Sequence, residues 1–195
     1  MMIKLTTAEL LESSPSKFSG KLVAFATDTV FGVGAIYDEN FFLAQEKIYQ
    51  MKNRDASKPL AILASSFDQV SPHLVLHQEA SELTKHWPGA LTIIFQTSDA
   101  YFNHITSNHS VGIRIPHCPT ALAILNHLGV MAVTSINKSG EAPLNDTGTI
   151  EQQFASYIDY LVVDEYPSSG RSSTVVDARM LPYKIIRQGE VKINN

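Results

Sequence analysis

Apolar positions follow two different periods along the chain, and together they predict alternating strands and helices. Short apolar runs predict buried strands at residues 21–26, 59–64, 90–96, 111–115, 130–134, 160–163, 174–177 and 184–187. Helical spacing of apolar positions predicts helices at residues 38–51, 79–86 and 120–127. In the first helix Phe41, Ala44, Ile48 and Met51 share one face, and Asp38 is placed to cap it. The pattern predicts about eight strands and four or five helices.

The order of these elements predicts the fold class. Strands and helices alternate without an internal repeat or linker, which favours an α/β fold with an open, twisted, mixed sheet and flanking helices. We expect a single domain over residues 1–195. Residues 138–149 are rich in Gly, Pro, Asn and Asp and predict a loop. The polar motifs fall at strand ends and in loops, where α/β sheets place ligands.

Composition narrows the class of protein. The chain of 195 residues has 44% hydrophobic residues, 17% charged residues and a formal net charge of -4. This mild acidity disfavours a protein that mainly coats nucleic acid, although it permits a local basic face. The one cysteine, Cys118, fits a reducing compartment, and residues 1–12 lack the pattern of a signal peptide. No apolar run is long enough to span a bilayer. We therefore expect a cytoplasmic protein that does not enter a membrane.

A cluster of cations at residues 52–58 suggests a phosphate site. Lys52, Arg54 and Lys58 lie where a helix gives way to a strand. Arginine offers a planar fork to phosphate oxygens and lysine a point charge. The alternative is a solvated helix end, where cations also suit the helix dipole. The chain has no P-loop, and Gly32 and Gly34 lack the third glycine of a dinucleotide fingerprint. These glycines are expected to relieve crowding near a packed turn.

A second candidate is Arg114, which interrupts an apolar strand. Strand alternation places it on the face of Gly112 and Pro116, opposite Val111, Ile113 and Ile115. A charge in such a place needs an anionic partner, either a ligand or a structural carboxylate.

Two further clusters combine hydroxyl, amide and cationic side chains. Ser135 and Asn137 follow a strand and can bind a small polar ligand, or can cap a turn. Arg171 stands before a hydroxyl-rich run, and Arg187 ends a strand. No pair of nucleophile and base is evident, and no metal ligand set is expected from the side chains, because His73 and His77 lack a third ligand.

Taken in order, these motifs resemble the YrdC family of threonylcarbamoyl-AMP synthases, in its short form. The resemblance covers about residues 21–191. Its pieces are residues 27–32 (TDTVFG), 52–54 (KNR), 58–60 (KPL), 87–92 (WPGALT), 114–116 (RIP), 135–140 (SINKSG), 173–177 (STVVD) and 187–189 (RQG).

The resemblance implies a YrdC-like fold with a concave positive cleft and a nucleotidyltransferase activity. L-threonine, bicarbonate and ATP would give threonylcarbamoyl-AMP and pyrophosphate, for modification of the adenosine beside the anticodon of certain tRNAs. ATP would be a substrate, with Mg²⁺ accompanying it. Partners would be the tRNA threonylcarbamoyl transferase machinery, with weak RNA binding by the protein itself. Both reagents are anions, so placed cations and donors can supply catalysis without a protein nucleophile.

Residue roles are carried over from the resemblance. The implied catalytic residues are Lys52, Arg54, Ser135 and Asn137. The implied ATP-binding residues are Lys52, Arg54, Lys58, Ser110, Asn137, Asn145 and Arg187. The implied threonine-binding residues are Thr27, Thr29, Arg114, Ser135, Ser173 and Thr174, and the sequence leaves open which of Thr27 and Thr29 meets the substrate.

The chain departs from the family pattern at Ala26, Asp55, Ile136 and the pair Leu144-Asn145. Asp55 brings a negative charge near the proposed phosphates, and Ile136 narrows a site where a small residue is common. Three other functions stay open. They are an RNA-binding or ribosome-maturation factor of the same fold without ATP turnover, a carbamoyl-adenylate enzyme for a different acceptor, and an inactive relative that serves as an interaction module.

Overall fold

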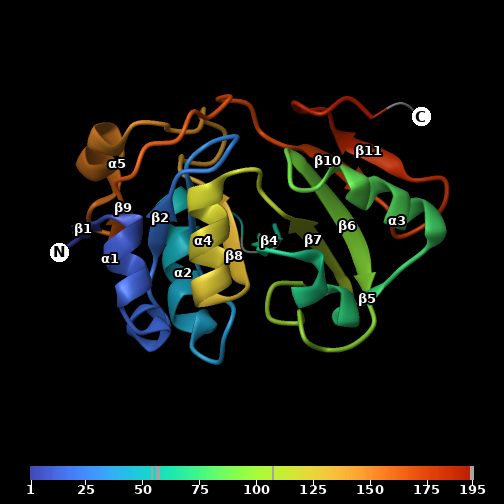
Figure 1. The fold of residues 1–195 in the computed structure, drawn as a ribbon, viewed down its shortest axis with the longest axis horizontal. Helices are drawn as coiled ribbons and strands as arrows, with labels where there is room; N and C mark the ends of the chain where they lie inside the picture. The colour runs from blue at the N-terminus through green and yellow to red at the C-terminus, as the bar shows by residue number, and fades with distance from the viewer. Residues whose placement is uncertain (54, 56–57, 107, 194–195) are drawn as a thin grey trace.

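One mixed sheet runs through the molecule and joins its first residues to its last (Figure 1). The computed structural model describes residues 1–53, 55, 58–106 and 108–193. Among them the sheet has 11 strands. They are β1 (Ile3–Leu5), β2 (Val23–Phe25), β3 (Gly32–Ile36), β4 (Ala61–Leu63), β5 (Leu74–Val75), β6 (Leu91–Thr97), β7 (Ser110–Arg114), β8 (Met131–Ser135), β9 (Tyr160–Val162), β10 (Thr174–Asp177) and β11 (Lys184–Arg187).

The strand order is β1-β9-β2-β3-β8-β4-β7-β6-β10-β11, and β5 pairs with β6 beside this path. Parallel and antiparallel pairs are mixed: β9 is parallel to both β1 and β2, whereas β3 is antiparallel to both β2 and β8. Further along, β4 is parallel to β7 and antiparallel to β8, and β10 is parallel to β6. The predicted open mixed α/β sheet is therefore confirmed. Both ends of the order, β1 and β11, are edges of the sheet.

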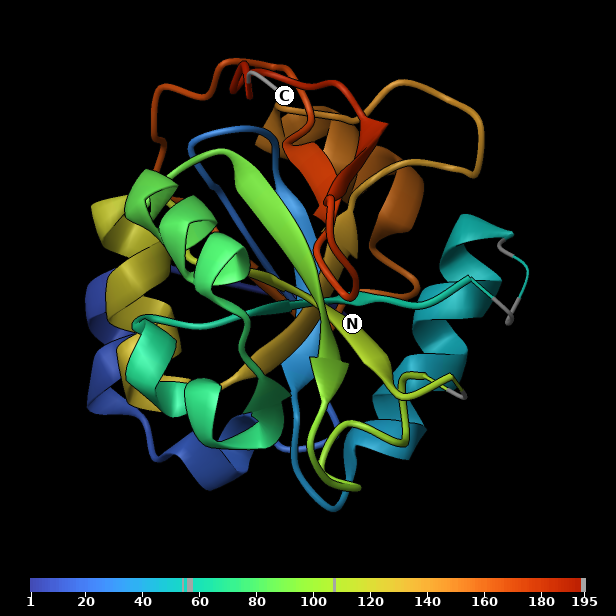
Figure 2. The same cartoon turned by 90° about the vertical axis from the view of Figure 1, so that its right-hand side faces the viewer.

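Helices cover both sides of this sheet. The α-helices are α1 (Thr7–Glu12), α2 (Phe41–Lys52), α3 (Gln78–Leu83), α4 (Pro119–Leu128) and α5 (Thr147–Phe154), and shorter 3-10 turns are η1 (Pro15–Phe18), η2 (Phe67–Gln69), η3 (Ser71–His73) and η4 (Thr84–His86). Figure 2 shows α1 and α4 together on one side of the sheet and α2 on the other. Within the part of the chain that the structure describes, no helix has the length and apolar character needed to cross a membrane.

The structure corrects several sequence predictions. The helix predicted at residues 38–51 begins at Phe41, and Asp38 does not cap it; its carboxylate instead accepts from the Asn40 backbone N–H at 2.9 Å. The region predicted to be a loop to residue 149 contains the start of α5, which Asp146 caps by accepting from the Thr149 N–H at 3.1 Å. The elements β1, α1 and β5 were not predicted, because each is too short to show a clear period of apolar residues.

The strand β3 was also missed, because its glycines read as a turn. A Cβ on Gly34 would lie 2.3 Å from the Ala132 carbonyl oxygen, so the space between β3 and β8 at this position is too small for any side chain. The predicted crowding is real, but it lies between two central strands rather than at a turn.

Alternation along β6, β7 and β10 separates a core face from a polar face. Leu91, Ile93 and Phe95 on β6 are fully buried in the core, whereas Thr92 and Ile94 point to the opposite face. On β7 the prediction for residues 111–114 is confirmed, since Ile113 enters the core and Arg114 lies on the polar face. This polar face forms the floor of a cavity.

Candidate functional site

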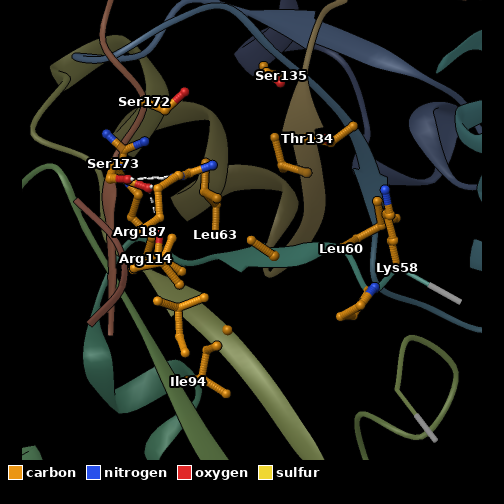
Figure 3. A pocket seen from close by; sticks show the side chains of 18 of the residues that line it. Lys58, Leu60, Leu63, Ile94, Arg114, Thr134, Ser135, Ser172, Ser173 and Arg187 are labelled. Carbon is orange, nitrogen blue, oxygen red and sulfur yellow. Dashed lines mark hydrogen bonds between the residues drawn. The ribbon is translucent and has the colours of Figure 1, made fainter. Parts of the chain in front are cut away.

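The polar face of the sheet holds a cavity of about 520 Å³. Among the described residues, seven strands (β3, β4, β6, β7, β8, β10 and β11) and the segments that flank them contribute to its walls. Figure 3 shows Arg114, Arg187 and Ser173 close together at one end and Lys58 at the other. The polar and charged side chains that line it are Thr27, Thr29, Lys58, Thr92, Asn108, Ser110, Arg114, Thr134, Ser135, Ser172, Ser173, Arg179 and Arg187.

Arg114 is fixed from three sides. Its Nε donates to the Gly89 carbonyl oxygen at 3.1 Å, Nη1 to Thr29 Oγ1 at 2.7 Å and Nη2 to Asp28 Oδ1 at 2.5 Å. Only 6% of the residue is exposed. Burial lowers the pKa of the guanidinium, and the Asp28 carboxylate opposes that shift. These contacts use three of its five N–H groups, and no hydrogen bond from the other two to a described residue is observed.

The turn that carries Asp28 is held by a hydroxyl. Thr27 Oγ1 donates to the Val30 carbonyl oxygen at 2.6 Å and accepts from the Thr29 and Val30 backbone N–H groups. It also lies 3.0 Å from Thr29 Oγ1. Both threonines line the cavity, so the structure leaves open which of them meets a substrate. Thr27 shapes the turn, and Thr29 joins it to Arg114.

A second buried hydroxyl pair lies beside the arginines. Thr92 Oγ1 and Ser173 Oγ are 2.8 Å apart, and each residue is 6% exposed. Arg187 donates from Nε and Nη2 to the Ser173 carbonyl oxygen at 3.1 and 2.9 Å. Burial lowers the pKa of Arg187. The guanidinium of Arg187 is therefore held by Ser173, the residue before β10, and it lines the same cavity as Arg114.

Thr174, by contrast, does not line the cavity. It is fully buried, and its hydroxyl donates to the Val191 carbonyl oxygen at 2.6 Å and accepts from the Gly189 N–H at 2.9 Å. A Cβ on Gly189 would lie 2.3 Å from the Ser172 carbonyl oxygen. In this structure Thr174 ties the segment after β11 to β10.

Only some of the residues predicted to bind ATP line the cavity. Lys58, Ser110 and Ser135 line it, whereas Asn145 lies outside it and accepts from the Phe31 N–H at 3.2 Å. Ser110 Oγ donates to Asn108 Oδ1 at 2.6 Å. Arg54 lies outside the residues that the structure describes.

Lys52 is buried next to the cavity rather than in its wall. Its Nζ donates to the Ser135 carbonyl oxygen at 2.5 Å, to the Asn137 carbonyl oxygen at 3.1 Å and to Asn137 Oδ1 at 2.8 Å. Asn137 Oδ1 also accepts from Ser135 Oγ at 2.6 Å, and its Nδ2 donates to the Lys138 and Glu141 carbonyl oxygens. Lys52 and Asn137 thus hold the end of β8 and the following loop, and Ser135 is the member of this network that reaches the cavity.

The structure adds two cavity residues that the sequence did not indicate, Thr92 and Arg179, and one residue behind the cavity wall, Asp28. Asp28 pairs with Arg114, Thr92 pairs with Ser173, and Arg179 lines the cavity while bound to Asp177. Asp28 and Thr92 stood inside recognised motifs, but only the fold shows their partners. Arg171 does not line the cavity, and Cys118 is fully buried, with Sγ 3.6 Å from the Ala26 carbonyl oxygen.

The described residues do not offer a protein-only metal site. They contain no group of three or more His, Cys, Asp or Glu side chains placed to share an ion. Two carboxylates at this face, Asp28 and Asp177, are each bound to an arginine. Their acceptor set therefore does not fit a resident Mg²⁺, which prefers oxygen ligands free of such partners.

The fold and cavity define an open-sheet α/β protein with a cavity lined by cationic and hydroxyl side chains. The chain belongs to the Sua5/YciO/YrdC family, whose model carries the description "Telomere recombination" and matches residues 18–189. The resemblance drawn from the motifs is thereby confirmed.

Similar proteins fall into two length classes. A threonylcarbamoyl-AMP synthase of Pyrococcus abyssi is 33% identical over 175 residues, covering 87% of this chain and 51% of that protein. One of Vibrio parahaemolyticus is 31% identical over 176 residues, covering 87% of this chain and 93% of that protein. The chain thus spans about half the length of the archaeal relative and nearly all of the bacterial one.

Solved structures agree with the fold. P. abyssi Sua5 complexed with L-threonine has a TM-score of 0.83 at 30% identity, covering 97% of this chain and 57% of that one. E. coli YciO has a TM-score of 0.81 at 20% identity, covering 97% and 94%; at that identity it supports the fold alone.

Proposed function

We propose that this protein is a threonylcarbamoyl-AMP synthase that uses L-threonine, bicarbonate and ATP. The observation that carries the proposal is Arg114. It is held in place by Asp28, Thr29 and Gly89 and keeps two N–H groups for a ligand, in a chain whose relatives bear this name. The threonine-bound relative supports the choice of amino acid.

The chemistry has two steps. The threonine amine condenses with bicarbonate to a carbamate, and one water leaves. A carbamate oxygen then attacks the α-phosphorus of ATP, and the bond to pyrophosphate breaks. Both reactants of the second step are anions, so the site must bring negative charges together. Arg114 would hold the threonine carboxylate, and Arg187 and Lys58 would offset the charge of the phosphates.

Hydroxyl groups would orient the reagents between these cations. Thr29 and the pair of Thr92 and Ser173 lie near Arg114, where an amino acid would sit. Ser135 would line the junction with the nucleotide, and its position is set by Lys52 and Asn137. We propose that Lys52 acts through these two residues, since its ammonium is enclosed by their oxygens. ATP would bring any Mg²⁺ as a phosphate complex.

The product would serve tRNA threonylcarbamoylation, with a separate transferase completing the modification.

A direct assay tests the assignment. Purified protein is incubated with ATP, bicarbonate and each of several amino acids, and pyrophosphate and an adenylated product are measured. We expect turnover with threonine that depends on bicarbonate, and at least a hundredfold loss of kcat/KM in Arg114→Lys, which cannot reproduce the fork. Salt-dependent RNA binding without pyrophosphate release would favour the RNA-binding factor instead. Lack of any amino-acid dependence would refute the proposed function.

A further inference from the structure

A second cavity of about 450 Å³ adjoins the first. Asn108 and Arg179 line both of them. The other lining residues come from the end of β6, the segment before β7, and the turn between β10 and β11. They are Gln96, His109, Asp177, Met180, Pro182 and Lys184. None of these six belongs to the site described above.

Strand register shows that the second cavity continues the floor of the first. On β6, Thr92 and Ile94 line the first cavity and Gln96, the next residue on that face, lines the second. On β10, Val175 lines the first and Asp177 the second. Two residues of a strand advance about 6.6–6.8 Å, so the two cavities form one furrow along the strands.

Two donors in the second cavity are fixed by neighbouring side chains. Arg179 donates from Nε and Nη2 to the two carboxylate oxygens of Asp177, at 2.9 and 2.6 Å. Asn108 Oδ1 accepts from Thr106 Oγ1 and Ser110 Oγ, each at 2.6 Å. This orients the amide so that its N–H₂ group is the polar end left for the cavity. The carboxylate of Asp177 is meanwhile occupied by the guanidinium.

Three further polar side chains line the same cavity, and among the described residues none has a hydrogen-bonded partner. They are the ammonium of Lys184, the imidazole of His109 and the amide of Gln96. Lys184 lies directly across from Asp177 in the β10–β11 pair, and its charge lowers the pKa of that carboxyl, after the larger effect of Arg179. The cavity therefore presents a fixed guanidinium, a fixed amide and a second cation around one neutralised carboxylate. Such a set of donors is built for an anion.

We propose that the second cavity is an anion subsite that receives pyrophosphate leaving the first cavity, with Arg179 passing it from one to the other and Lys184 completing its binding. The identity of the anion rests on the proposed function, because pyrophosphate is the anion that the reaction releases. The donor set itself rests on the geometry alone. Inorganic pyrophosphate carries several negative charges, which suits two cations, one in the turn after β10 and one on β11, whereas AMP has its one phosphate beside a base and a sugar.

Binding to the purified full chain tests the subsite without requiring turnover. Calorimetric titrations with pyrophosphate and, separately, with AMP are compared for the wild type, Lys184→Met and Lys21→Met. Lys21 is exposed, lies before β2 and lines neither cavity, so Lys21→Met removes the same charge elsewhere. We expect Lys184→Met to weaken pyrophosphate binding about three- to tenfold, with AMP binding unchanged and Lys21→Met like the wild type.

Other outcomes decide against the subsite or separate it from the proposed function. Equal pyrophosphate affinity in Lys184→Met and Lys21→Met would overturn it. An equal loss for AMP would assign the cavity to the nucleotide. If the protein fails to adenylate threonine and Lys184→Met still weakens pyrophosphate binding selectively, the subsite stands and the proposed function falls.

Discussion

The guanidinium of Arg114 and the carboxylate of Asp28 form a buried ion pair, with 2.5 Å between Nη2 and Oδ1 and only 8% and 14% of the two side chains exposed. The sequence offered two partners for Arg114, a ligand or a structural carboxylate. The structure shows the carboxylate, and no hydrogen bond from two of the five N–H groups to a described residue is observed. The alternative of a structural carboxylate is therefore met, and binding of a ligand by Arg114 stays a prediction, which a guanidinium permits because it can bind two anions along different edges.

Removing the charge of Asp28 should affect both stability and threonine binding. In Asp28→Asn the guanidinium stays buried with a neutral partner, so we expect about 3–5 kcal/mol lower stability in urea unfolding. Arg114 would also lose its orientation, and we expect the KM for threonine to rise about tenfold or more, while the KM for ATP changes less.

The exposed pair of Lys4 and Glu151 supplies a matched control for Asp28→Asn. Its side chains are 52% and 46% exposed, so Glu151→Gln should cost at most about 0.5 kcal/mol. Equal stability losses in Asp28→Asn and Glu151→Gln would show that the pair with Arg114 is no more than a surface contact.

Lys52 gives a second prediction, on positioning. Lys52→Met removes the donor from three oxygens of Ser135 and Asn137 and should cost about 2–4 kcal/mol. Enzyme that remains folded should lose kcat more than ATP affinity, because Ser135 shifts while Lys58 stays in the cavity wall.

Thermal unfolding and steady-state kinetics of Lys52→Met and Lys52→Arg test this role. Lys52→Arg keeps the charge but cannot fit the same three oxygens, so it should not restore kcat. A variant with normal kcat and a strongly raised KM for ATP would instead make Lys52 a direct phosphate ligand.

Much of the sheet was predictable because its strands are apolar and bounded by turn residues. The predictions for residues 174–177 and 184–187 coincide with β10 and β11, and the motif order identified the family. The local sequence pattern gave wrong predictions where the role of a residue depends on a neighbour that is distant in the sequence. Gly34 looks like a turn residue, and only its approach to Ala132 shows that it belongs to a central strand.

The same limit applies to the site. Residue types pointed to Arg114, Ser173 and Arg187, which do meet in one cavity. Nothing local indicated that Thr174, beside Ser173, would face away from it, or that the ammonium of Lys52 would be enclosed by Ser135 and Asn137.

Gly34 leads to a third prediction. In Gly34→Ala the new Cβ would meet the Ala132 carbonyl oxygen, which is fixed in the sheet, whereas in Gly32→Ala it would meet a methyl group of Val133 at 2.8 Å. A side chain can turn away more easily than a backbone. We expect Gly34→Ala to cost about 3 kcal/mol or more and Gly32→Ala about 1–2 kcal/mol, measured by urea unfolding. A larger loss in Gly32→Ala would contradict the predicted order.

The pair of Asp177 and Arg179 makes stability depend on pH. The hydrogen bonds from Arg179 hold the pKa of Asp177 below its usual range, so the folded state favours the ionised carboxyl. A carboxyl with a lowered folded-state pKa stabilises the protein above the unfolded-state value, which is about 3.9, and this contribution is lost as pH falls through the folded-state pKa. Arg179 is 38% exposed, so the contribution should be small, about 0.5–1 kcal/mol at pH 7.

Urea unfolding of the wild type and Asp177→Asn between pH 7 and pH 2 isolates this term. The difference in unfolding free energy should be constant from pH 7 to about pH 5 and should shrink below about pH 4. In the Arg179→Met variant, the main group that lowers the pKa of Asp177 is absent. The difference in unfolding free energy that Asp177→Asn makes in that variant should therefore no longer depend on pH. The difference could instead stay constant down to pH 2, or its pH dependence could survive unchanged in Arg179→Met. Either result would mean that Arg179 does not hold the carboxyl of Asp177 in its ionised form. The second cavity would then lack the neutralised carboxylate on which its proposed anion binding depends.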